Sequence, residues 1–88
     1  MAMNSWRVDI DFDEDETHTR ATVRAEVRDA ETVIAHGDEY RNPKDTNQPL
    51  IGEEIAAARG LIALGSQLLQ QAAARVEQVT HRPVHLGP

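Results

Sequence analysis

The sequence predicts an α+β fold of the order β-β-β-α, in which a three-stranded antiparallel meander carries one long C-terminal helix on one face. Two observations predict it. Apolar and polar residues alternate in three successive segments before residue 42, as in half-buried strands. Apolar residues then recur at helical spacing from residue 50 to residue 80, a stretch without proline. Three strands followed by a helix are typical of a two-layer domain, and we expect residues 1–88 to form a single one.

The first two strands are expected at about residues 5–12 and 19–28. Four apolar residues of the first strand alternate with charged ones and define its inner face: Trp6, Val8, Ile10 and Phe12. The inner face of the second strand carries only small apolar residues: Ala21, Val23, Ala25 and Val27. We therefore expect the helix to approach this second strand closely.

The third strand is expected at about residues 32–41, after a turn at residues 29–31. Its sequence leaves the phase open, because Val33 and Ala35 fit one face whereas Ile34, His36 and Tyr40 fit the other. A bulge at residue 37, which is a glycine, would switch the register between these two sets.

The helix is expected over about residues 50–80, with Pro49 in its first turn. One apolar stripe is predicted to face the sheet: Ile51, Ile55, Ala58, Ile62, Leu69, Ala73 and Val76. A second stripe adjoins it: Ala57, Leu61, Leu64, Leu68 and Val79. A helix on one sheet face needs an apolar arc of only about 100°, so the second stripe is expected to meet another surface.

The length of the helix favours the same conclusion. Thirty helical residues span about 45 Å, whereas a strand of eight residues spans about 26 Å, so the C-terminal half should extend beyond the sheet. We therefore predict a homodimer formed through the helix, with Leu61, Leu64, Leu68 and Val79 as the interaction surface. The alternative is that the sheet or the C-terminal tail of the same subunit covers these side chains.

Composition excludes several classes of function. The net charge of −6 argues against non-specific binding to nucleic acid or to anionic membranes, because both require a basic surface. The absence of cysteine excludes disulfides, thiol catalysis and cysteine-based zinc sites. No segment has the length of a membrane span or the pattern of a signal peptide. We expect a soluble cytoplasmic protein.

Three segments carry a resemblance to a known family. Residues 51–61 (IGEEIAAARGL) resemble the signature I-G-[DE]-E-[LI]-A-x-A-R-x-L, residues 41–45 (RNPKD) resemble a preceding R-L-D-P-A-D turn, and residues 80–84 (THRPV) resemble a T-H-x-P-V tail. Together they resemble a small actinobacterial family of uncharacterised proteins whose fold is similar to the double-stranded-RNA-binding domain. The resemblance implies a β-β-β-α fold and no activity.

No catalytic, cofactor-binding or metal-binding residues are predicted. The acidic run from Asp9 to Glu16 lacks the glycine and the glutamate that an EF-hand loop needs at its sixth and twelfth positions. His81 and His85 are separated by a proline and have no partner ligand nearby in the sequence. For Arg59 we consider an ion pair with Asp45 that would hold the crossing loop.

The leading hypothesis is a non-enzymatic protein that self-associates and acts through protein contacts. One alternative is a nucleic-acid-binding module, which the fold analogy suggests and the net charge disfavours. Another is a stress-response accessory protein that binds a small molecule or a metal at the margin between helix and sheet.

Overall fold

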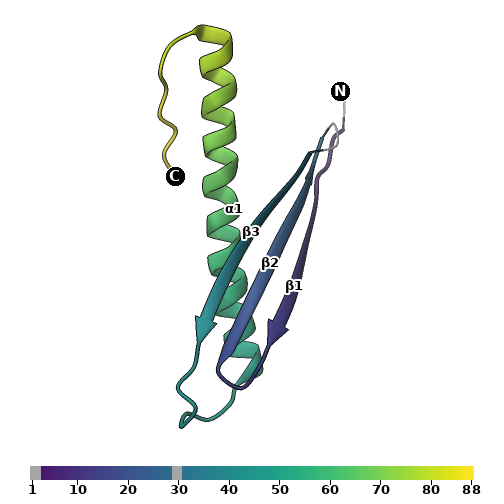
Figure 1. Ribbon diagram of the computed structural model, residues 1–88. Helices are drawn as coiled ribbons and strands as arrows, with labels where there is room; N and C mark the ends of the chain where they lie inside the picture. The colour runs from purple at the N-terminus through teal and green to yellow at the C-terminus, as the bar shows by residue number, and fades with distance from the viewer. Residues whose placement is uncertain (1–2, 29–30) are drawn as a thin grey trace.

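The computed structural model describes residues 3–28 and 31–88. It contains four elements in the order β1 (Arg7–Glu14), β2 (His18–Val27), β3 (Glu31–Tyr40) and α1 (Pro49–Thr80). The strands form one antiparallel sheet in the order β1-β2-β3, and α1 packs against one face of it (Figure 1). The predicted meander with a long C-terminal helix is confirmed. Residues 29 and 30 of the predicted turn lie outside the described residues.

The inner face of the sheet is set by an unbroken register. Val8, Ile10 and Phe12 of β1 pair with Ala25, Val23 and Ala21 of β2, and Val23 pairs in turn with Ala35 of β3. The strand β3 keeps one phase throughout, with Gly37 directly opposite Ala21. The bulge predicted at Gly37 is therefore wrong.

Gly37 is instead required because the helix backbone passes directly over it. A methyl group at this position would overlap the backbone of α1 at Ala56 and Gly60. A methyl group at Gly60 would in turn lie 2.6 Å from Val23 Cγ2. Two glycines thus allow a strand and a helix to approach almost backbone to backbone. This contact offsets the cost of a glycine in the middle of a helix, which is about 1 kcal/mol relative to alanine.

The stripe of α1 that faces the sheet is a row of small residues ending in one leucine: Gly52, Ala56, Gly60 and Leu64. The predicted sheet-facing stripe is wrong for four residues, all of which are exposed: Ile51, Ala58, Ile62 and Val76. The prediction gave most weight to large hydrophobic side chains. The close approach to the sheet selects small ones instead, so the helix is rotated about its axis relative to the prediction.

The hydrophobic core is small. It consists of Val23, Ala25, Val33, Ala35 and Leu64. Among the described residues, Val23 is the largest side chain that is fully buried. The core therefore supplies little apolar burial for a chain of 88 residues.

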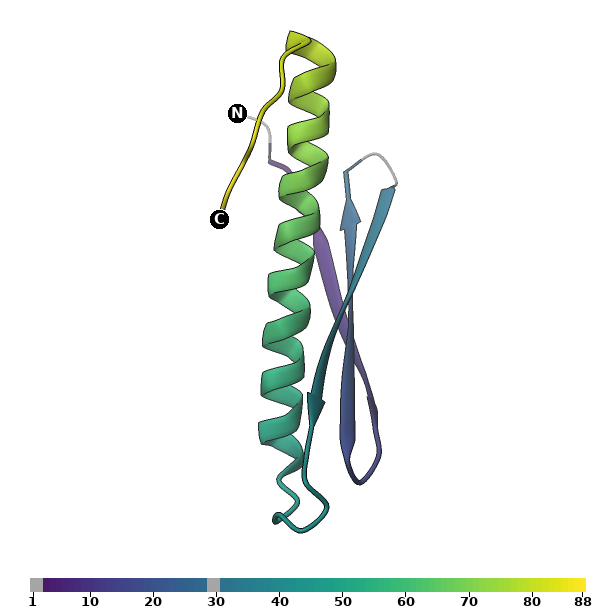
Figure 2. The ribbon, with the colours of Figure 1, turned by 60° about the vertical axis from the view of Figure 1, so that its left-hand side comes forward.

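The molecule is elongated, with extents of 54 × 30 × 19 Å. Only the last turns of α1 extend past the end of the sheet, not the whole C-terminal half as predicted, because Leu68 still packs on the core and Arg75 bonds to Glu31 of β3 (Figures 1 and 2). The C-terminal tail turns back alongside the helix. His81 ends the helix in the left-handed conformation (φ 60°), and its N–H donates to the Glu77 carbonyl at 2.7 Å. Within the described residues, no helix combines the length and the apolar character that a bilayer-spanning segment needs.

Candidate functional site

The candidate site is the side of α1 that faces away from the sheet, between β1 and the C-terminal tail. The helix packs on β2 and β3. The tail follows one flank of its C-terminal half, where tail residues 84–88 enclose a hollow with Leu69, Ala73 and Glu77. The Val84 N–H donates to Glu77 Oε2 at 3.2 Å. Part of the predicted sheet-facing stripe is thus covered by the tail rather than by the sheet.

The four predicted interaction residues divide between the core and this open side. Leu64 is only 5% exposed and belongs to the core, so the prediction is wrong for it. Leu68 is half-buried and packs against the same core, so less of its side chain is exposed to a partner than predicted. Leu61 and Val79 are 44% and 80% exposed, and both are available to a partner.

Strand β1 adds a second apolar wall to the open side. Its inner-face residue Val8 is 46% exposed, while Ile10 and Phe12 are half-buried. Trp6 was predicted within the strand but precedes it, because β1 begins at Arg7, and it is 50% exposed. The cause is geometric. A helix is about 10 Å wide and neighbouring strands are about 4.8 Å apart, so α1 can cover two strands but not three. We define the open groove as the surface formed by Val8, Ile10 and Phe12 of β1 and the preceding Trp6, together with Leu61 and Leu68 of α1.

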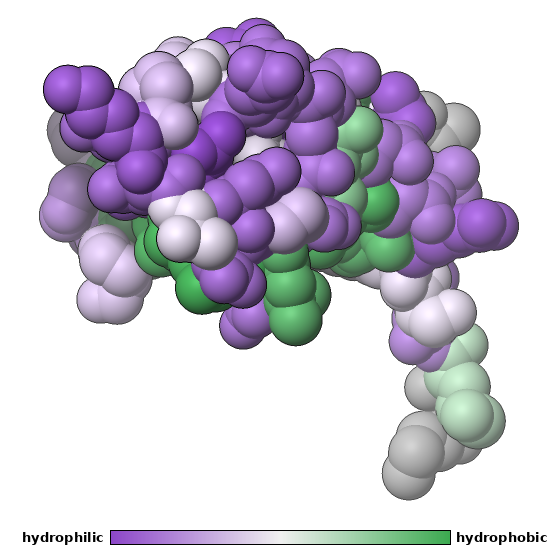
Figure 3. Space-filling view, turned by 90° about the horizontal axis from the view of Figure 1, so that it is seen from below, coloured by the Kyte–Doolittle hydropathy of each residue, from purple (hydrophilic) through white to green (hydrophobic). Residues whose placement is uncertain are grey.

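The surface chemistry of the molecule differs between its sides. Figure 3 looks from the end at which α1 begins, and apolar side chains gather along the lower side of that view while hydrophilic side chains cover the upper side. The helix has no charged residue from Gly60 to Ala74, although 27% of the chain is charged. A solvent-exposed helix normally carries charges on its outer face, so this uncharged side is typical of a surface that binds another protein.

The exposed side of α1 also has the spacing of a helix–helix seam. Residues on it alternate at intervals of three and four: Ile51, Glu54, Ala58, Leu61, Gly65, Leu68 and Ala72. Such spacing keeps one narrow stripe directed at a second helix. A methyl group added at Gly65 would meet no described atom within 4 Å. Sequence reasoning did not place Ala58 and Gly65 on this side of α1, although both follow the same intervals of three and four residues.

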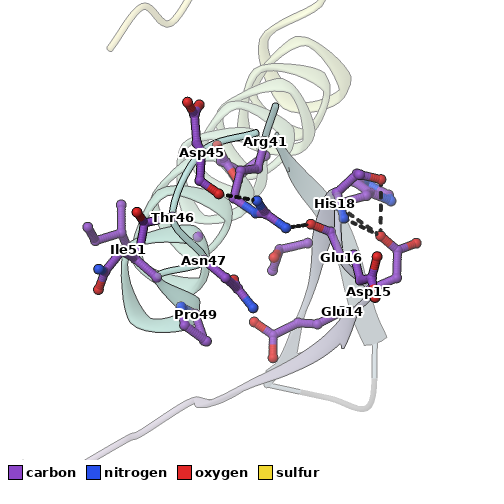
Figure 4. Close-up of a pocket in the computed structure, with 15 residues that line it drawn as sticks. Glu14, Asp15, Glu16, His18, Arg41, Asp45, Thr46, Asn47, Pro49 and Ile51 are labelled. Carbon is purple, nitrogen blue, oxygen red and sulfur yellow. Dashed lines mark hydrogen bonds between the residues drawn. The ribbon is translucent and has the colours of Figure 1, made fainter. Parts of the chain in front are cut away.

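A second hollow lies at the end of the molecule where α1 begins. It has a volume of about 430 Å³, and the β1–β2 turn, the loop before α1 and the first turn of α1 line it (Figure 4). Arg41 crosses it and donates to the carbonyls of Asn42, Asp45 (2.7 Å) and Glu16. The guanidinium is used to join the loop to the hairpin, so we interpret Arg41 as a structural residue.

Comparison with known proteins places the chain in a family. The Rv2632c-like family matches residues 4–85. The chain belongs to the Rv2632c-like family. It is 40% identical over 84 residues to two uncharacterised proteins, Mb1767 of Mycobacterium bovis and MT1780 of Mycobacterium tuberculosis, with 96% of this chain and 88% of each relative covered. The crystal structure of Rv2632c superposes with a TM-score of 0.84 at 28% identity, covering 94% of this chain and 98% of that one.

In this member of the Rv2632c-like family, the outer face of the sheet carries a compact polar cluster around Asp38. Arg20 donates to its Oδ1 through Nε at 2.9 Å, and His18 donates to the same oxygen through Nε2 at 2.7 Å. These two donors lower the pKa of the Asp38 carboxyl from 3.8 to about 2. His18 also stacks on the Tyr40 ring, with centroids 4.4 Å apart. Both oxygens of Asp38 accept bonds from within the cluster, so we interpret it as a structural network.

The ion pair considered between Arg59 and Asp45 is not formed. Arg59 donates instead to the backbone carbonyl of Asp38 at 2.7 Å, which ties α1 to β3 beside Gly37.

Asp15 of the acidic run accepts the backbone N–H groups of Thr17 and His18, both at 2.8 Å, and these bonds lower the pKa of its carboxyl. In the part of the chain that the structure describes, no three His, Asp or Glu side chains are grouped as metal ligands would be.

Proposed function

We propose that this protein is a non-enzymatic interaction protein that acts as a homodimer through α1. The observation that carries the proposal is the uncharged, apolar side of α1 that remains exposed beside the uncovered inner face of β1. A contact between two such surfaces would remove apolar area from water at about 25 cal/mol per Å². It would also add to the small core, which a domain of this size needs for stability.

The occupant of this surface is inferred to be a second copy because of charge. A chain with a net charge of −6 repels its own copies, so self-association needs a contact region without charged side chains. The segment from Gly60 to Ala74 is such a region. A typical stable interface buries about 800 Å² on each partner, and an uncharged segment about 22 Å long, together with β1, is of the size that such a contact requires.

The matched pair Leu61→Asp and Ile34→Asp tests the proposal. Both side chains are 44% exposed, but Leu61 lies on the open side of α1 and Ile34 on β3, whose outer face is polar. We expect Leu61→Asp to reduce the mass in solution to that of one chain, and Ile34→Asp to leave the mass of the dimer unchanged. Circular dichroism spectra identical to that of the native protein would show that both variants are folded. A folded Leu61→Asp variant with the native mass would contradict the proposal.

The similarity to the double-stranded-RNA-binding fold and a cytoplasmic location also remain proposals. The location is supported by the lack of cysteine. An RNA-binding role is disfavoured by the end of the molecule where α1 begins, which carries nine acidic residues against the basic Arg20, Arg41 and Lys44. The acidic residues are Asp13, Glu14, Asp15, Glu16, Asp38, Glu39, Asp45, Glu53 and Glu54. Salt-sensitive binding of duplex RNA at low ionic strength would reverse this conclusion.

A further inference from the structure

The open groove has the dimensions of a site for one helix. The helix α1 covers β2 and β3, and the inner face of β1 beside it is left exposed. A second helix lying next to α1 would complete the covering of the three-stranded sheet, because each helix covers about two strands. Both walls of the open groove are apolar, so they fit a helix whose contact face is apolar.

The helix that fits this groove is one with a narrow apolar seam, and α1 itself carries one. The intervals of three and four from Ile51 to Ala72 would allow side chains of one copy to enter the spaces between side chains of the other. Gly65 lies within this seam and has free space where a side chain would be. Because a glycine has no side chain, it allows a second backbone to approach closely at that point.

Charge then selects the direction of the second helix. The end where α1 begins is acidic, as described above, whereas the opposite end carries four arginines: Arg7, Arg28, Arg75 and Arg82. Among the described residues, three acidic residues accompany them: Glu26, Glu31 and Glu77. Two of these arginines are already paired within the chain, Arg7 with Asp9 at 3.3 Å and Arg75 with Glu31 at 3.0 Å, so this end is much closer to neutral than the acidic one. A parallel pair would place two acidic ends together, and like charges at close range repel. An antiparallel pair places each acidic end beside the arginine-bearing end of the partner.

We propose that α1 of a second copy lies antiparallel in the open groove, with the two-fold axis passing near Gly65. This inference rests on the proposed self-association and specifies its geometry. Each residue then lies opposite the one equally far from Gly65 on the other side. Ile51 and Val79 are each fourteen positions from Gly65 and therefore face each other in the dimer. Both side chains are exposed in the single chain, so both are available for this contact.

The chain has no cysteine, so a single cysteine introduced by substitution reports directly which positions of the two copies lie close together. The variants Ile51→Cys and Val79→Cys, one of them carrying an affinity tag, would be mixed, allowed to exchange subunits and treated with a short bismaleimide. The two positions are about 42 Å apart along one helix, which is far beyond the reach of the reagent. The variant Glu26→Cys, exposed in β2, gives the background from random collisions. The masses of all three variants are measured before cross-linking.

The expected result is a cross-link between position 51 of one chain and position 79 of the other, at least tenfold above the Glu26→Cys background. Each variant alone should give no more than that background. Cross-linking of each variant to itself would show a parallel dimer and overturn the inference while leaving the proposed function intact. Variants that are dimeric by mass but do not cross-link above background would overturn it too. A native protein with the mass of one chain would overturn both the inference and the proposed function.

Discussion

Gly60 and Gly65 lie five residues apart in the same helix but on different sides of it, and their surroundings differ completely. Gly60 is buried, with Val23 Cγ2 2.6 Å from where its side chain would begin. A side chain beginning at Gly65 would meet no described atom within 4 Å apart from the adjoining helix backbone. The first glycine is explained by the fold of a single chain. The second is not, and this difference indicates that the two sides of α1 serve different contacts.

The largest effect is expected on the side that faces the sheet. Gly37→Ala would place a methyl group into the backbone of α1 at Ala56 and Gly60, neither of which can move without displacing the helix. We expect a loss of more than about 4 kcal/mol in the free energy of unfolding, which lies in the range of severe overpacking. Urea unfolding followed by circular dichroism would measure it. A native-like unfolding midpoint would show that the helix and β3 are further apart than described.

Alanine substitutions of leucines should also destabilise the chain more on the side of α1 that faces the sheet than on the open side. Leu64→Ala removes a core side chain and should lower the free energy of unfolding by about 3 kcal/mol. Leu61→Ala should cost the isolated chain less than about 1 kcal/mol, because Leu61 is 44% exposed, and should mainly weaken the dimer. Measuring unfolding at protein concentrations below the dissociation constant of the dimer separates the effect on the isolated chain from the effect on the dimer. Equal losses for both variants would contradict the assignment of one to the core and the other to the surface.

Gly65→Ala sharpens the comparison because it should act in opposite directions on the chain and on the dimer. Alanine is favoured over glycine inside a helix by about 1 kcal/mol, and the single chain has space for the added methyl group. We therefore expect the isolated chain to become more stable by about that amount and the dimer to dissociate more readily. Sedimentation velocity over a dilution series measures the second effect. An unchanged dissociation constant would place the contact between helices away from Gly65.

The smallest effect is expected on the polar outer face and depends on pH. The pKa of Asp38 is lowered from 3.8 to about 2 by its bonds to Arg20 and His18, so the native state favours the charged carboxylate. Its contribution to stability is present above pH 3.8 and is lost as the pH falls through about 2. Asp38→Asn should reduce this acid sensitivity. Some sensitivity should persist, because the pKa of Asp15 is lowered as well. Identical acid unfolding curves for the variant and the native protein would contradict the assignment.

Sequence patterns predicted the fold well because the first two strands alternate strictly and the helix has no internal proline. The rotation of α1 was not predicted, since periodicity ranks Ile51 and Ile62 above Gly52 and Gly60, while the close approach over Gly37 reverses that ranking. The same error placed Leu64 on the surface. The groove beside β1 could not be read from the sequence either, because it depends on which two strands the helix covers. Leu61 and Val79 were predicted as surface residues and are exposed.

The most direct test of the account is the mass of the native protein in solution, measured by sedimentation equilibrium over a range of micromolar concentrations. The account predicts a mass of twice the 9.8 kDa of one chain, which falls towards 9.8 kDa on dilution. A mass of 9.8 kDa at every concentration would contradict it and would show that the open side of α1 faces water or a different protein.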